Sequence, residues 1–135
     1  MTALRSAGRI LLAGVFIHGG WCTLADPAPR VQAAGPLLAW LRKQVPGLPS
    51  DETVVRANAA VHVTAGLLLA AGAFDRHAAA VLAASLVPTT AAGHPFWAVS
   101  DPARRDGEII QVAKNLGVLG GLLLLACRRP GTGTR

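Results

Sequence analysis

Long apolar segments, separated by short polar ones, dominate the pattern along the chain. Each is close to the roughly 20 residues that an α-helix needs to cross a bilayer. Only Asp75, Arg76 and His77 separate the second segment from the third, which is room for a tight turn between antiparallel neighbours. The pattern predicts an all-α membrane protein, a four-helix transmembrane bundle that forms a single domain over residues 1–127. The predicted spans are residues 4–25, 54–74, 78–99 and 109–126.

The first loop is the longest polar segment and has a helical pattern of its own. Leu37, Leu41 and Val45 recur at helical spacing, and Pro36 suits the first position of a helix. We expect a short amphipathic helix over residues 36–45 that lies in the membrane interface, with Trp40 as an anchor. A loop helix that merely caps the bundle fits the pattern equally well. The basic tail, residues 128–135, has no periodicity and is predicted to be disordered.

Composition supports a membrane protein. Hydrophobic residues make up 52% of the chain and charged residues 15%, and the mean hydropathy is +0.43. Soluble domains usually carry about 25% charged residues. The net charge of +6 is spread over the helix ends, so we expect the lipid bilayer as a partner and no nucleic acid.

The loops give a preferred orientation. Lysine and arginine are shared almost equally between the two sides, and the acidic residues gather on the side of the first loop. We expect a multi-pass protein of the bacterial cytoplasmic (inner) membrane, with both termini in the cytoplasm. This topology places Cys22 and Cys127 at opposite membrane faces.

Polar residues within the apolar segments share one half of the predicted membrane. Counted from the loop side, His94 and Lys114 lie about 7 Å deep, and His18 and His62 lie about 10–12 Å deep. Such groups are costly in lipid unless a partner or ligand satisfies them, so we predict a funnel that opens toward the loops. The candidate ligand-binding residues are His18, Trp21, Asn58, His62, His94, Trp97, Lys114 and Asn115.

Each candidate also has a purely structural explanation. A histidine within a membrane is more often a hydrogen-bonding link between helices than a ligand-binding residue. Lys114 can extend its ammonium group to the interface. Three histidines on separate helices without carboxylate support do not indicate a metal site.

Several short motifs are spread over nearly the whole chain. They are Arg9-x-Leu11-Leu12, Pro88-Thr89-Thr90, Gly93-His94-Pro95-Phe96-Trp97, Asp101-Pro102 and Lys114-Asn115-Leu116. Together these motifs resemble the DoxX family. The run from His94 to Leu125 is the most specific part, and the start of the chain is similar to that family's first helix. Many relatives carry an acidic residue near the start of the second helix, where this chain has Arg56 and Asn58.

The resemblance implies a function connected with membrane redox chemistry. The family is named for a subunit of a thiosulfate:quinone oxidoreductase, and its relatives are linked to membrane-associated redox and oxidative-stress complexes. It implies an accessory or quinone-binding subunit, with a membrane or peripheral redox protein as partner or a homo-oligomer. We expect no required cofactor and no intrinsic enzymatic activity; an active form would be part of a quinone-linked oxidoreductase. The alternative is a non-catalytic membrane scaffold, or a lipid- or cargo-binding protein without a redox role.

In the quinone hypothesis several of the candidate residues have separate roles in binding. Lys114 and His94 would hydrogen-bond a carbonyl or anionic head, and Asn58 and Asn115 would orient it. The rings of Trp21 and Trp97 would flank the bound ring.

Overall fold

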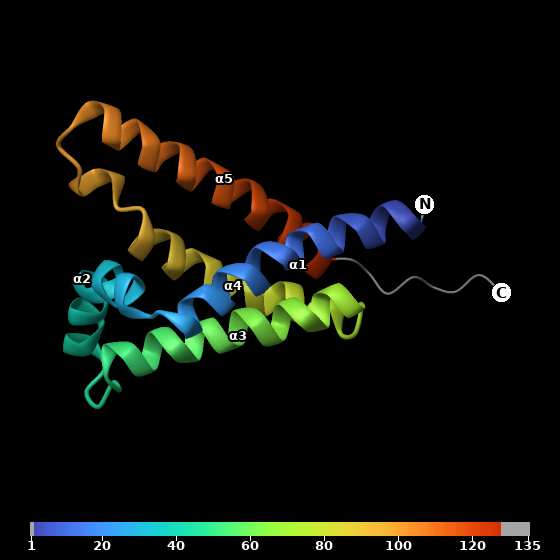
Figure 1. The fold of residues 1–135 in the computed structure, drawn as a ribbon, viewed down its shortest axis with the longest axis horizontal. Helices are drawn as coiled ribbons and strands as arrows, with labels where there is room; N and C mark the ends of the chain where they lie inside the picture. Colours follow the sequence, from blue (N-terminus) through green and yellow to red (C-terminus); the bar gives the residue numbers. More distant parts are fainter. Residues whose placement is uncertain (1, 128–135) are drawn as a thin grey trace.

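The computed structural model describes residues 2–127, and all regular structure within that range is helical (Figure 1). The predicted tail, residues 128–135, lies outside the described residues. The start of α1 and the end of α5 lie at one end of the molecule, and α2 lies at the other (Figure 1). The elements are α1 (Thr2–Ala25), α2 (Ala28–Gln44), α3 (Asp51–Ala71), α4 (Asp75–Gly93), the 3-10 helix η1 (Phe96–Ala98) and α5 (Pro102–Ala126).

Local sequence signals set the helix ends, and several differ from the predicted spans. The backbone N–H of Thr53 donates to the Ser50 hydroxyl, so α3 begins at Asp51 instead of residue 54. Asp101 caps α5 in the same way, so this helix begins at residue 102 and not at 109. The ring of Pro95 disfavours a helical conformation at His94, so α4 ends at Gly93 instead of continuing to residue 99.

The loop helix is longer than predicted. α2 has 17 residues. Pro29 occupies its first turn, and Pro36, which was expected at the first position, lies inside the helix. The additional turns contain several alanines and no amphipathic pattern, which explains why the sequence did not reveal them. α2 packs across the ends of α3 and α4, and Trp40 is 58% exposed. A position in the membrane interface stays a prediction.

Close contact between α1 and α3 forms one side of the core. A Cβ atom added to Gly20 would lie 2.8 Å from the backbone oxygen of Ala59, and one added to Gly66 would lie 2.8 Å from Cγ1 of Ile17. Small residues that allow such close backbone approach are typical of helix pairs in membranes. The buried cluster beside this contact includes Phe16, Leu69, Leu82 and Leu122.

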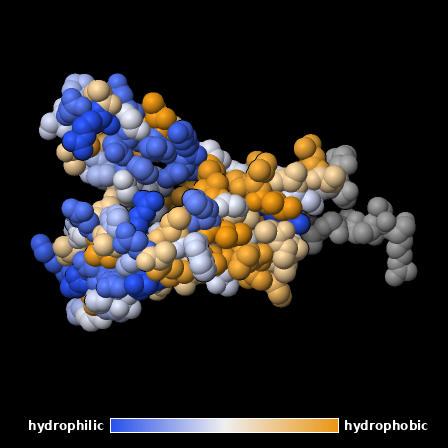
Figure 2. Space-filling view, in the orientation of Figure 1, coloured by the Kyte–Doolittle hydropathy of each residue, from blue (hydrophilic) through white to orange (hydrophobic). Residues whose placement is uncertain are grey.

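Among the described helices, three are long and apolar enough to cross a membrane, namely α1, α3 and α5. The prediction of four such helices is therefore not matched. α4 has 19 residues, starts with a charged turn, and carries Ser85, Thr89 and Thr90, which lower its hydropathy. Hydrophobic residues gather in one half of the molecule, and hydrophilic residues gather at the end where α2 and the start of α5 lie (Figure 2).

Candidate functional site

A closed network of polar side chains joins α3 to α4. The Ser85 hydroxyl donates to Oδ1 of Asn58 at 2.5 Å and lies 2.8 Å from Nε2 of His62. Because this hydroxyl has a single proton, Nε2 of His62 must be the donor to Ser85. Nδ2 of Asn58 donates to the Thr89 hydroxyl at 3.2 Å, and that hydroxyl donates to the backbone oxygen of Ser85 at 2.8 Å. The hydroxyls of Ser85 and Thr89 thus each donate one hydrogen bond and accept another within the network.

His62 is buried against the packed core. It is 8% exposed, and its ring meets that of Phe16 in an edge-to-face arrangement with centroids 5.2 Å apart. Asn58 and His62 are both candidate residues from the sequence, four positions apart on one face of α3. Their partners make them a link between helices within the described structure.

α4 makes a second set of polar contacts on its opposite side, with α5. Nδ2 of Asn115 donates to the Thr90 hydroxyl at 3.0 Å. Beyond the end of α4, Nδ1 of His94 lies 2.7 Å from Oε2 of Glu108. The neighbouring residues Thr89 and Thr90 therefore face different helices, and α4 is joined by hydrogen bonds to both α3 and α5.

A small pocket of about 190 Å³ lies between α4 and α5. His94, Trp97 and Asn115 line it, together with Thr90 and a mostly apolar wall that includes Leu116. The ring of Trp97 packs edge-to-face on that of Phe96, and Trp97 is 62% exposed. This pocket brings together three of the candidate residues.

The other candidate residues lie elsewhere. His18 and Trp21 are exposed on α1, and Nε2 of His18 lies 3.8 Å from Sγ of Cys22. Lys114 is exposed on α5 and does not line the pocket with His94. Consecutive helical residues point about 100° apart, so Asn115 faces α4 while Lys114 does not. The predicted single funnel is instead divided into a closed network, a small pocket and exposed side chains.

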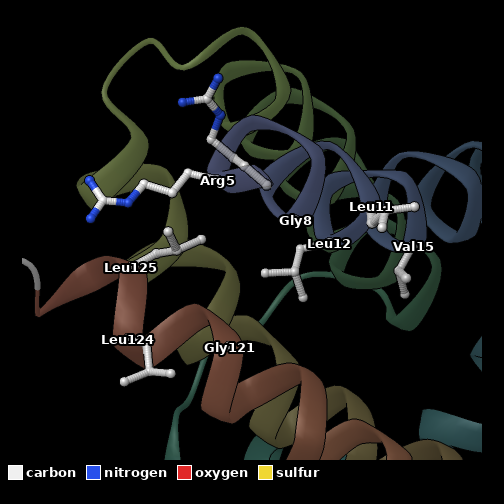
Figure 3. A pocket seen from close by; sticks show the side chains of 9 residues that line it. Arg5, Gly8, Leu11, Leu12, Val15, Gly121, Leu124 and Leu125 are labelled. Carbon is white, nitrogen blue, oxygen red and sulfur yellow. The ribbon is translucent and has the colours of Figure 1, made fainter. Parts of the chain in front are cut away.

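A larger pocket, of about 650 Å³, lies between α1 and α5 and was not predicted (Figure 3). Arg5 and Arg9 line it together with Gly8, Gly121 and leucine side chains from both helices. The sequence offered one signal: Arg9 lies in the second turn of the first apolar segment, four residues after Arg5. Sequence reasoning also missed Ser85, although it lies one turn before Thr89 on the same helix face.

The fold defines the class of this chain as an all-helical, multi-pass membrane protein. Its apolar helices are long enough to cross a bilayer, and the polar side chains of α4 pair with neighbouring helices.

The chain belongs to the DoxX family. The sequence model of the DoxX family matches residues 4–95, which is more than half of the chain. This confirms the family resemblance seen in the sequence. The match covers α1 to α4 and ends at Pro95, so most of the run from His94 to Leu125 lies outside it. No curated protein and no solved structure matches the chain significantly.

Proposed function

We propose that α4 is a fourth membrane-crossing helix. In this proposal the protein lies in the inner membrane of a bacterium, and both of its termini are in the cytoplasm. α4 packs between α3 and α5. Its hydroxyl groups at Ser85, Thr89 and Thr90 are paired with α3 and α5 or with its own backbone. These hydroxyl groups lower the mean hydropathy of α4. Their hydrogen bonds to neighbouring helices nevertheless remove most of the free-energy cost of placing them in lipid.

We further propose that this protein is an accessory, quinone-binding subunit of a membrane-associated redox complex. The observation that supports this proposal is the pocket between α4 and α5, where His94 and Asn115 face an apolar wall beside Trp97. Ligand sites typically have such a composition, mostly apolar with a few polar groups that orient the ligand. At about 190 Å³ the pocket would hold a single ring and leave an isoprenoid tail in the lipid.

The donors and acceptors of the pocket suit a quinone or its quinol. Glu108 occupies Nδ1 of His94, which leaves Nε2 of the same ring to accept a hydrogen bond from a quinol hydroxyl. Nδ2 of Asn115 donates one of its two N–H groups to the Thr90 hydroxyl, and the second N–H can donate to a carbonyl oxygen of the quinone. The indole of Trp97 would cover the ring.

In this proposal the chain binds the quinone and has no activity of its own. Electrons would pass between the bound quinone and a redox centre of a membrane or peripheral partner protein. A homo-oligomer would present the same pocket once in every protomer.

Tryptophan fluorescence tests the quinone proposal, because a quinone quenches an indole with which it is in contact. The double variant Trp21→Phe/Trp40→Phe leaves Trp97 as the reporter. Titration with a short-chain ubiquinone in detergent should quench Trp97 along a saturating curve. Asn115→Leu should weaken binding about 10-fold, as expected for the loss of one hydrogen bond in an apolar site.

The chain offers matched controls for this titration. Gln111→Leu removes an exposed amide one turn earlier on α5 and should leave the affinity unchanged. The variant Trp21→Phe/Trp97→Phe, which keeps Trp40, should show only weak, linear quenching. Equal, linear quenching of Trp97 and Trp40 would contradict the quinone proposal and favour the non-catalytic scaffold.

A further inference from the structure

The pocket between α1 and α5 is a cleft with apolar walls and two arginines. The helices touch where Gly121 meets Leu12: a Cβ atom on Gly121 would lie 3.3 Å from a methyl carbon of Leu12. Gly8 also lines the cleft, and a Cβ atom there would have nothing within 4 Å. Figure 3 shows Leu12 from α1 and Leu124 from α5 on its two sides. The volume of about 650 Å³ is typical of a ligand site.

Arg9 brings to this cleft a positive charge that has no ion-pair partner among residues 2–127. Its Nε atom is buried and has no hydrogen-bond partner within residues 2–127. Its guanidinium lies against Gly72 at the end of α3, where a Cβ atom would come within 2.7 Å of Nη1. The negative end of the α3 dipole favours a cation there but leaves the N–H donor of Nε unused.

Arg5 adds a second cation to the same site. It lies one helical turn before Arg9, so both side chains leave α1 on the same face. The ion pairs of the described residues involve Arg42, Arg56 and His94, and none involves Arg5 or Arg9. Two arginines beside an open apolar cleft therefore lack an anion in the part of the chain that the structure describes.

We propose that this cleft binds an anionic phospholipid. Its phosphodiester would accept hydrogen bonds from the guanidinium groups of Arg9 and Arg5, and an acyl chain would lie between Leu12 and Leu124. Guanidinium groups match phosphate oxygens in geometry and in charge. A soluble phosphate would satisfy the charge but would leave the apolar walls empty, whereas a zwitterionic lipid would fill the walls and bring no net negative charge. Basic pockets between membrane helices are a known setting for anionic headgroups.

Native mass spectrometry of the delipidated full-length protein in detergent tests this proposal. Phosphatidylglycerol should bind at one molecule per chain and at least about 10-fold more tightly than phosphatidylcholine with the same acyl chains. Arg9→Gln should reduce this preference to about 2-fold or less. Arg105→Gln, an exposed arginine near the other end of α5, makes the same change in charge and should keep the preference.

A second variant tests the cleft without touching either arginine. Gly8→Phe adds a ring to the open space and should remove the bound phosphatidylglycerol. Gly14→Phe adds the same ring at another position with nothing within 4 Å, outside the cleft, and should keep the lipid. If Arg9→Gln does not fold, Arg5→Gln and Gly8→Phe decide the result.

Three outcomes would overturn the assignment. The first is equal affinity for the two lipids, or a preference that survives both Arg9→Gln and Gly8→Phe. The second is full competition by glycerophosphoglycerol, the headgroup without acyl chains, which would identify a soluble phosphodiester as the ligand. The third is a dimer without any lipid adduct, which would identify a second copy of the chain as the occupant of the cleft.

Discussion

Replacing Gly20 with alanine should destabilise the protein by about 1–3 kcal/mol, the usual cost of overpacking a close contact. The new Cβ atom would lie 2.8 Å from the backbone oxygen of Ala59 and 2.9 Å from a methyl carbon of Val63. A backbone oxygen cannot move aside as a flexible side chain can, so α1 and α3 would have to separate. The same substitution at Gly14, where nothing lies within 4 Å, should instead stabilise α1 by up to about 1 kcal/mol.

The measurement is reversible unfolding in mixed micelles, followed by circular dichroism, for the two alanine variants and the unmodified chain. Opposite signs for Gly20→Ala and Gly14→Ala are the expected result. Equal effects would mean that helix propensity outweighs the contact between α1 and α3, and would contradict the packing described above.

Replacing Asn58 with leucine should cost about 2 kcal/mol, because it removes two hydrogen bonds and leaves the Ser85 hydroxyl without its acceptor. Thr64→Val, which removes an exposed hydroxyl from the same helix, is the control and should change stability by less than about 0.5 kcal/mol.

A double-mutant cycle separates this network from simple packing. Asn58→Leu combined with Ser85→Ala removes both partners, so the pair should cost less than the sum of the single variants by about 1 kcal/mol. Unfolding in mixed micelles measures all three variants. Additive effects would show that Asn58 and Ser85 do not share a hydrogen bond.

The sequence predicted the helical membrane class well because that class depends on the lengths of the apolar segments. The ends of the helices were harder to predict because they depend on single residues. Pro95 stops α4 before Trp97, and Asp101 starts α5 two turns before the apolar run at Ile109. His94 consequently lies in the connection after α4 and reaches Glu108, which lies just outside the predicted span 109–126.

The candidate site was predicted only in part, because depth along a helix is easier to infer than direction around it. Asn58 and His62 lie on one face of α3, since residues four apart share a face, and both contact Ser85 there. Lys114 and Asn115 are neighbours in sequence, yet Asn115 contacts α4 and Lys114 is exposed. Ser85 lies in an otherwise apolar run, and its hydrogen bond to Asn58 depends on how α3 packs against α4, which the sequence does not show.

Thiol labelling from one side of the membrane tests most directly the central claim that α4 crosses it. Cys22 and Cys127 are both exposed, and the helices between them that cross the membrane in this account are α3, α4 and α5. Three crossings between the two cysteines place them on opposite faces, whereas two crossings place them on the same face. With single-cysteine variants in intact cells, an impermeant maleimide should label only Cys22, and both cysteines should react after permeabilisation. Labelling of both cysteines in intact cells, or of neither until permeabilisation, would contradict a membrane-crossing α4.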